Sequence, residues 1–285
     1  MADPLSRIMA PQTFQELFSQ WALFPDAALC AGGTGFMYGQ GSRVPEFPQS
    51  IILLDKIEEL KKISRTERYL EIGAAVKLSQ LIRIGKIVPE ALSMSLSLAA
   101  DVQVRNQASI AGNICLASPG RIPDAVVPMI ALDAQYELRT AQSSRWISAS
   151  RFSSAAPQEL LTRIRIPLEV WSFTHYQKFG SSAIGIAGSG GSALFMMKNE
   201  KNILANLRIV CAGKSIFRDK SSEAMLLGKR LPLLPKDSEA FADRWKNYLS
   251  GTDSSADGLG EDAQGELAKV QIINFVRTVL RHISD

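Results

Sequence analysis

Two long apolar runs in the second half of the chain, residues 184–197 and 203–212, are joined by the polar, turn-forming segment Lys198–Asn202. This arrangement predicts an antiparallel hairpin. The residues that follow indicate three helices, with a flexible surface connection rich in Gly, Ser and Asp before the last. The helices are expected at 222–227, 237–248 and 266–282, and the connection at 251–265. The second part of the chain is therefore expected to be an antiparallel sheet with helices.

The first part of the chain mixes short strand-like runs with helical ones. A helix is expected to begin after Thr13, because Glu16 follows three residues later as in a capping box. Strands are expected at 27–30, 50–55, 69–74, 134–139 and 160–166, and helices at 78–84, 89–100 and 125–132. The strands at 50–55 and 69–74 would form a βαβ-like opening. The predicted fold class is α+β, with a first domain at 1–170, in subdomains of about 1–55 and 56–170, and a smaller domain at 171–285.

Composition narrows the class of protein. The 285 residues leave room for two domains, and 46% apolar with 21% charged residues is typical of a soluble globular chain. The purest apolar stretch, Val126–Leu132, is far shorter than the ~20 residues of a membrane span, and the N-terminus lacks the pattern of a secretory signal. We expect a cytoplasmic protein without a membrane span. A net charge of +4, with scattered basic residues, gives no indication of nucleic-acid binding.

Few side chains are arranged for catalysis or metal binding. Cys30, Cys115 and Cys211 are far apart and form no C-x-x-C, so neither a metal nor an iron–sulfur site is expected in this chain. Cys30 is interpreted as a buried strand residue rather than a redox group. His175 lies among Phe and Tyr on an expected strand, where a packed side chain is more common than a catalytic base. No catalytic residue is predicted.

A glycine-rich segment, Gly32-Gly33-Thr34-Gly35, follows the expected strand at 27–30. Glycines allow backbone N–H groups to turn inward and approach a phosphate with no Cβ in the way, so the segment is a candidate anion-binding loop. It matches neither G-x-x-x-x-G-K-[ST] nor G-x-G-x-x-G, because the Lys-Ser/Thr pair and the last glycine are missing. A tight turn without a ligand explains the glycines equally well.

A second loop, Ser109-Ile110-Ala111-Gly112-Asn113, combines small residues with hydroxyl and amide groups. Such a loop offers N–H groups and side-chain donors. Two loops of this kind fit a cofactor that carries a pyrophosphate better than one that carries a single phosphate. Asp124 stands just before the apolar stretch 125–132, and capping of that helix is its simpler role.

These pieces occur in an order that resembles a known family. The motifs are Ala31-Gly32-Gly33-Thr34, Asp55–Leu60, Ile72–Leu81, Gln103–Asn113, Ala117-Ser118-Pro119 and Ala131-Leu132-Asp133-Ala134. The series resembles the FAD-binding subunit of molybdenum hydroxylases. That family includes the medium subunit of carbon monoxide dehydrogenase and the flavin subunit or domain of xanthine dehydrogenase. The resemblance covers residues about 12–180, with a weaker match of the hairpin and helices to the family's C-terminal domain.

The resemblance implies a two-subdomain FAD-binding domain of the vanillyl-alcohol-oxidase/p-cresol-methylhydroxylase type, followed by a smaller C-terminal domain. FAD would lie between two subdomains, with its pyrophosphate on the two loops. By the same resemblance Asp124 would accept hydrogen bonds from the ribityl or neighbouring hydroxyls, and Lys178 would approach the flavin from the second domain. Ala99 and Leu161 would line the cofactor cleft. The residues expected to bind FAD are Cys30, Ala31, Gly32, Gly33, Thr34, Gly35, Phe36, Met37, Ala99, Ser109, Ile110, Ala111, Gly112, Asn113, Asp124, Leu161 and Lys178.

The resemblance also implies an electron path. Electrons would arrive one at a time from a partner subunit with [2Fe-2S] clusters, which is supplied by a molybdopterin-binding subunit. They would leave the flavin as a pair to NAD or another acceptor. The chain would be an oxidoreductase subunit that positions and tunes the isoalloxazine, because the cofactor carries the redox chemistry.

Some residues depart from the family pattern. Ala111 stands where glycine is usual, Gly35 stands where an acidic residue is common, and Arg121-Ile122 lengthens the approach to Asp124. The stretch 179–187 lacks the Arg and Asp residues often found near the flavin. These departures motivate a second hypothesis, a scaffold or assembly subunit that keeps the fold without flavin. A third, an independent flavin reductase such as the enolpyruvyl-glucosamine reductases, lacks the expected serine acid and glutamate pair.

Overall fold

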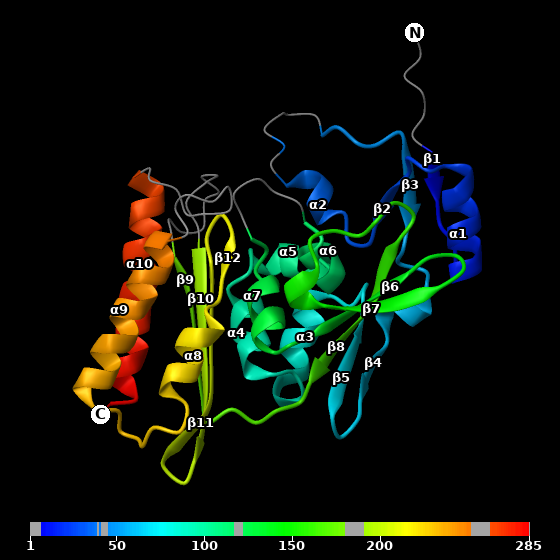
Figure 1. Cartoon of the computed structure of the whole chain (residues 1–285). Helices are drawn as coiled ribbons and strands as arrows, with labels where there is room; N and C mark the ends of the chain where they lie inside the picture. Colours follow the sequence, from blue (N-terminus) through cyan, green and yellow to red (C-terminus); the bar gives the residue numbers. More distant parts are fainter. Residues whose placement is uncertain are drawn as a thin grey trace. The chain divides into compact units, whose positions relative to one another are not determined.

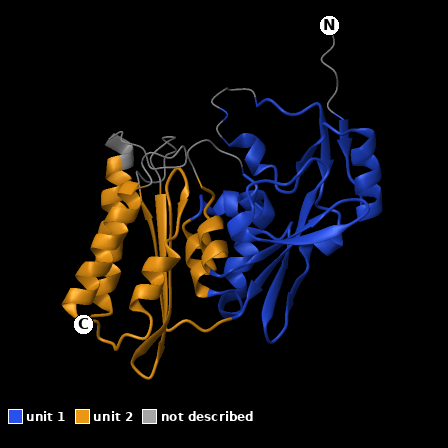
Figure 2. Cartoon of the chain, in the orientation of Figure 1, with its two compact units in different colours: residues 1–89, 99–116, 132–168 blue, residues 90–98, 117–131, 169–285 orange. Residues whose placement is uncertain are grey.

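The computed structural model describes residues 7–38, 40, 45–116, 122–179, 191–251 and 263–284. Its elements fall into two compact units (Figures 1 and 2). Unit 1 comprises residues 1–89, 99–116 and 132–168, and unit 2 comprises residues 90–98, 117–131 and 169–285. Residues 90–98 and 117–131 thus belong to unit 2 although they precede residue 169 in the chain. The division into domains at 1–170 and 171–285 stays a prediction.

Unit 1 begins with a three-stranded parallel sheet in the order β1-β3-β2. Its elements are β1 (Arg7–Met9), α1 (Phe14–Leu23), β2 (Ala28–Cys30), α2 (Thr34–Met37) and β3 (Ser50–Leu53). Helix α1 begins where the capping pair predicted, because the Thr13 hydroxyl accepts a hydrogen bond from the Glu16 N–H at 3.1 Å. Strand β2 ends at Cys30, so the glycine-rich loop starts at the carboxyl end of a strand of this sheet.

The second sheet of unit 1 has five antiparallel strands in the order β4-β5-β8-β6-β7. The strands are β4 (Ile63–Arg65), β5 (Tyr69–Gly73), β6 (Gln135–Arg139), β7 (Ser144–Ser148) and β8 (Leu160–Pro167). Along the second half of strand β8, buried side chains alternate with partly exposed ones, as expected for a half-buried strand. Ile164 and Ile166 are fully buried, whereas Arg163 and Arg165 lie on the opposite face and form ion pairs with Glu71 at 3.1 and 2.7 Å.

Short helical segments complete unit 1. They are η1 (Glu58–Lys61), α3 (Leu78–Ile84), η2 (Gly85–Ile87), α5 (Val102–Gln107), α6 (Ile110–Ile114) and η3 (Ala149–Arg151). The predicted βαβ-like opening is wrong, because the strands at 50–53 and 69–73 belong to different sheets. Strand β3 pairs in parallel with β1 and β2, while β5 pairs antiparallel with β4 and β8.

Unit 2 is built on a four-stranded antiparallel sheet in the order β12-β11-β10-β9. Its strands are β9 (Phe173–Phe179), β10 (Gly191–Glu200), β11 (Ile203–Ala212) and β12 (Ile216–Phe217), and its helices are α4 (Glu90–Ser97), α7 (Val126–Ala131), α8 (Lys220–Leu226), α9 (Pro235–Gly251) and α10 (Ala263–His282). The predicted hairpin is confirmed as β10 and β11. Residues 184–190 of its first predicted strand lie outside the described residues, as do residues 252–262 of the predicted surface connection.

Both faces of the sheet in unit 2 are buried. On one face Phe195 packs with Trp245 of α9 and Phe275 of α10 in a hydrophobic core, which explains why the three predicted helices are amphipathic. Leu194 and Met196, which alternate with Phe195 along β10, are also fully buried, and helices α4 and α7 contact the strands of this sheet. The α+β fold class is confirmed.

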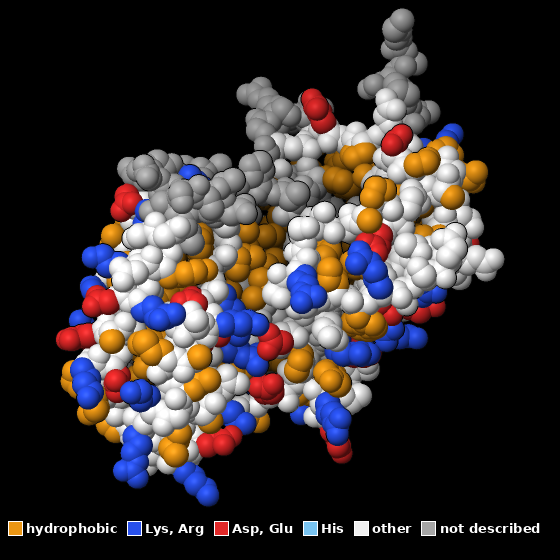
Figure 3. Space-filling view, viewed as in Figure 1, with side chains coloured by type: hydrophobic (Ala, Val, Ile, Leu, Met, Phe, Trp, Pro, Cys, Tyr) orange, Lys and Arg blue, Asp and Glu red, His pale blue; other side chains and the backbone are white. Residues whose placement is uncertain are grey.

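The described residues lack two kinds of feature. None of the helices that they form combines the length and apolar character that a membrane crossing requires. The same residues bring no group of three or more His, Cys, Asp or Glu side chains together as a metal site. On the face shown in Figure 3, basic and acidic side chains are interspersed.

Candidate cofactor-binding site

The first glycine-rich loop turns sharply after β2. Gly33 has φ +71°, in the left-handed region that glycine adopts without strain, and the single turn of α2 follows it. The Phe36 N–H donates to the Gly33 carbonyl at 3.1 Å. Among the described residues, no acceptor receives the backbone N–H groups of Thr34 and Gly35. The loop therefore presents two N–H donors that an anion can accept.

The side chain of Cys30 is hydrogen-bonded to the backbone of this loop. The N–H of Gly33 bonds to the Cys30 thiol, and burial raises the pKa of the thiol. A raised pKa keeps the sulfur protonated at neutral pH, which agrees with a structural rather than a nucleophilic cysteine.

The two predicted loops lie side by side within unit 1. A Cβ built on Gly32 would lie 1.9 Å from the carbonyl oxygen of Gln107, the last residue of α5. No side chain fits in that space, so Gly32 is required for the backbone of the first loop to approach the segment leading into Ser109. The structure thus places the first loop against Gln107 and Ala108, the two residues immediately before the second loop.

The N–H groups of the second loop are used by the protein itself. Those of Ile110, Ala111, Gly112 and Asn113 all have acceptors. The acceptors are, in the same order, the Val76 carbonyl, the Ala74 carbonyl, the Ser109 hydroxyl oxygen at 3.1 Å and the Ser109 carbonyl. This loop caps α6, and the hydroxyl proton of Ser109 is a donor that it can still direct to a ligand.

Ala99 and Leu161, predicted to line a cofactor cleft, are buried within unit 1. Ala99 is 1% exposed and its carbonyl oxygen accepts from Arg105 at 2.9 Å. Leu161 is 3% exposed on β8, opposite Leu138 of β6. Their roles at a cofactor stay predictions.

Asp124 and Lys178, both in unit 2, form an ion pair. Lys178 Nζ lies 2.6 Å from Asp124 Oδ1, and the Asp124 side chain is 8% exposed. Lys178 also donates to the Leu98 carbonyl at 3.2 Å, and the Ser95 hydroxyl donates to the Asp124 carbonyl at 2.5 Å. These contacts anchor the carboxylate, so two residues that the sequence proposed separately act as one charged pair.

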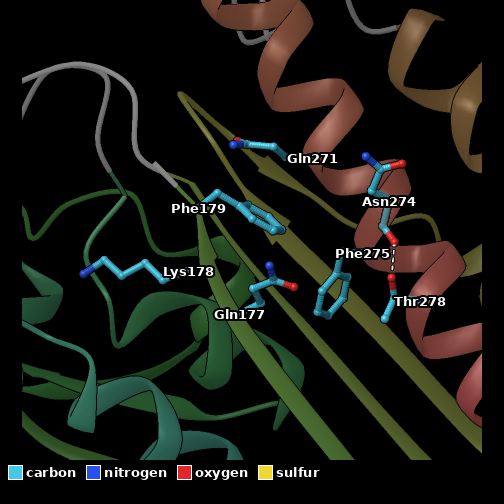
Figure 4. A pocket seen from close by; sticks show the side chains of 7 residues that line it. All are labelled: Gln177, Lys178, Phe179, Gln271, Asn274, Phe275 and Thr278. Carbon is cyan, nitrogen blue, oxygen red and sulfur yellow. Dashed lines mark hydrogen bonds between the residues drawn. The ribbon is translucent and has the colours of Figure 1, made fainter. Parts of the chain in front are cut away.

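A pocket of about 320 Å³ lies at β9 and α10 in unit 2 (Figure 4). It is lined by Gln177, Lys178, Phe179, Gln271, Asn274, Phe275 and Thr278. Figure 4 shows the Lys178 side chain extending away from Phe179 and Phe275. The other lining residues carry amides, a hydroxyl and aromatic rings, so apart from Lys178 the lining offers hydrogen bonding but no acid–base group. Nearby, His175 stacks at 5.6 Å on Phe275, and its interpretation as a packed side chain is confirmed.

Lys77 is a residue of this region that the sequence analysis missed. It occupies the N-cap position of α3, and its ammonium donates to the Gln107 carbonyl at 2.7 Å. A lysine before a helix is ordinarily a solvated side chain, which is why no pattern singled it out. The one available signal was its place within the motif Ile72–Leu81.

Comparison with known proteins identifies the family. The family described as "FAD binding domain in molybdopterin dehydrogenase" matches residues 4–169. The chain belongs to this family. The resemblance recognised from the ordered motifs is confirmed, and with it the assignment to an oxidoreductase family whose members bind FAD.

The chain covers different shares of its relatives' lengths. The chain is 28% identical over 242 residues to the nicotinate dehydrogenase FAD-subunit of Eubacterium barkeri, covering 79% of this chain and 80% of that subunit. It is 26% identical over 245 residues to the carbon monoxide dehydrogenase medium chain of Hydrogenophaga pseudoflava, covering 80% and 82%. It spans only 18% of xanthine dehydrogenase 2 of Arabidopsis thaliana, to which it is 26% identical over 246 residues, covering 77% of this chain.

Solved structures share the fold. A chain of the carbon monoxide dehydrogenase of Hydrogenophaga pseudoflava matches with a TM-score of 0.80 at 23% identity, over 99% of this chain and 98% of that one. A chain of quinoline 2-oxidoreductase from Pseudomonas putida 86 matches with a TM-score of 0.77 at 20% identity, over the whole of both chains. At these identities the likeness supports the fold.

Proposed function

We propose that this chain binds FAD and serves as the FAD-binding electron-transfer subunit of a molybdenum hydroxylase. The observation that carries the proposal is the loop after β2. There the left-handed Gly33 turns the backbone so that the N–H groups of Thr34 and Gly35 have no acceptor among the described residues. Such a loop fits the diphosphate of FAD, because phosphate oxygens accept hydrogen bonds from successive N–H groups.

The residues present fit the cofactor in distinct ways. The two N–H groups of the first loop and the Ser109 hydroxyl would bind phosphate oxygens. The Asp124 carboxylate, held by Lys178 at 2.6 Å, would accept hydrogen bonds from ribityl or neighbouring hydroxyls. When bound, FAD supplies the exchange between one-electron and two-electron transfer. The protein's part is binding and orientation, since no nucleophile is needed.

The named relatives suggest which partner subunits and which electron acceptor this chain works with. The subunits from Eubacterium barkeri and Hydrogenophaga pseudoflava are named as a FAD-subunit and a medium chain, and this chain matches about four fifths of each. By analogy with these named subunits, we propose that the chain works with an iron–sulfur subunit and a molybdopterin-binding subunit. We propose NAD or another acceptor for the electron pair, and a cytoplasmic location.

Heat stabilisation by FAD tests the proposal. A ligand that binds only the folded state stabilises it by about 2.7 kcal/mol at a concentration 100 times its Kd. The thermal unfolding midpoint of the purified chain should therefore rise by about 4–5 °C at that FAD concentration, and less with riboflavin, which lacks the phosphates. An unchanged unfolding midpoint with FAD, together with no spectral change on titration, would refute the proposed cofactor function.

One observation favours a second function, a scaffold or assembly subunit without flavin. All four N–H groups from Ile110 to Asn113 bond within the protein, so the second loop offers fewer donors than its glycine and asparagine suggest. The scaffold hypothesis predicts that the complex assembles normally although the chain is silent in FAD titrations. Pull-down of the partner subunits, run beside the FAD titration, separates the two functions.

A further inference from the structure

Lys77 is joined to the second loop of the candidate site in unit 1, and it bonds the same carbonyl oxygen against which the first loop packs. Its ammonium donates to the Gln107 carbonyl oxygen at 2.7 Å, the same oxygen against which the backbone of Gly32 packs. Its backbone forms a bridge with Ser109, the first residue of the second loop. The lysine therefore lies where the two loops meet.

Among the described residues, no carboxylate forms an ion pair with the ammonium of Lys77. An ammonium has three donors, and the Gln107 carbonyl takes one of them. Burial lowers the pKa of this partly buried ammonium, although the charge of Asp55 acts in the opposite direction. Asp55 acts at a distance, since no carboxylate in the described part of the chain forms an ion pair with Lys77. A partly desolvated cation with donors to spare favours an anionic ligand.

We propose that Lys77 binds the diphosphate of FAD and supplies the positive charge of the site. The inference rests on the proposed function, and it names the part of the cofactor that this region recognises. The first loop contributes neutral N–H donors, and in the second loop the N–H groups from Ile110 to Asn113 are already bonded. A charged donor beside them forms shorter and stronger hydrogen bonds to phosphate oxygens than neutral groups do.

A purely structural role for Lys77 makes a different prediction. If the side chain served only to bond Gln107, any donor of sufficient length would replace it. Lys77→Gln keeps an N–H donor and removes the charge, whereas Lys77→Arg keeps the charge. Lys77→Thr is a second neutral variant, because threonine is a favoured N-cap residue and should preserve the start of α3. Lys86, an exposed residue of η2 at the other end of α3, offers the matched control Lys86→Gln.

The experiment is a fluorescence titration of the full chain with FAD, with ADP as competitor and riboflavin as the phosphate-free probe, at low and high salt. We expect Lys77→Gln and Lys77→Thr to weaken FAD and ADP binding about tenfold or more. Riboflavin affinity should not change, and Lys77→Arg and Lys86→Gln should bind FAD like the wild type. Added salt should weaken FAD binding by the wild type more than by Lys77→Gln.

Each other outcome has a definite meaning. If the wild type binds no FAD, the proposed function and this inference both fail. If the wild type binds FAD and the neutral Lys77 variants bind it equally well, the inference alone is overturned. It is also overturned if these variants lose riboflavin and FAD to the same extent, because the effect would then not depend on the diphosphate. Thermal unfolding of each variant checks that it is folded.

Discussion

Replacing Gly33 by aspartate and, separately, by asparagine isolates the effect of charge in the first loop. Gly33 has φ +71°, and among the described residues a Cβ there would meet only Cys30 Sγ, at 3.9 Å, so space is available. Asparagine and aspartate are the side chains that tolerate this conformation best, and each should cost about 1 kcal/mol of stability. The two variants have nearly the same size and the same backbone strain. They differ in one negative charge at the place proposed for the diphosphate.

The expected effect follows from Coulomb's law. A carboxylate about 5 Å from a phosphate charge, at an effective dielectric of about 20 to 80, is repelled by about 1–3 kcal/mol. Gly33→Asp should therefore bind FAD about 5- to 150-fold more weakly than Gly33→Asn. Equilibrium dialysis against FAD measures both dissociation constants, and the difference should shrink in high salt. Equal affinities, with both variants folded and the wild type binding FAD, would show that this loop does not hold the diphosphate.

Three further predictions concern stability. Gly32→Ala places a methyl group 1.9 Å from the Gln107 carbonyl, so chemical denaturation should show a loss of about 3 kcal/mol, and an unchanged midpoint would contradict the close approach. Asp124→Asn should cost about 2 kcal/mol by removing the ion-pair partner of Lys178, and a double-mutant cycle with Lys178→Met should show a coupling that independent side chains lack. Burial, together with the charge of His282, lowers the pKa of His175 below its ordinary value of 6.5. The imidazole therefore takes up its proton at a higher pH in the unfolded chain than in the folded one, and the free energy of unfolding should fall as the pH drops below 6.5. His175→Phe should remove that part of the pH dependence, and an unaltered pH profile would refute the assignment.

Elements with a strong local signal were predictable from the sequence. The hairpin of β10 and β11 follows from two apolar runs with a polar turn between them, and helix α1 follows from Thr13 and Glu16. The strands β1, β4 and β7 were not predicted. Strands β1 and β4 have three residues each, and none of the three contains a buried residue, so the apolar periodicity that identifies a strand is absent. The pairing of β3 with β1 rather than β5 depends on contacts between distant segments, which a local pattern does not contain.

The candidate site was predictable in its residue types but not in its hydrogen bonds. Glycines after a strand indicate that N–H groups can face a ligand. Only the fold shows that those of Thr34 and Gly35 have no acceptor in the described part of the chain, whereas those from Ile110 to Asn113 are taken. Lys77 was missed for the same reason, since its significance comes from the Gln107 carbonyl, thirty residues further along the chain.

The visible absorption spectrum of the purified chain, recorded after incubation with FAD and removal of free cofactor by desalting, tests the central claim most directly. The account predicts flavin bands that remain with the protein at about one FAD per chain and that are weaker in Gly33→Asp than in Gly33→Asn. A folded wild-type chain that elutes without flavin bands would contradict it and would favour the scaffold function.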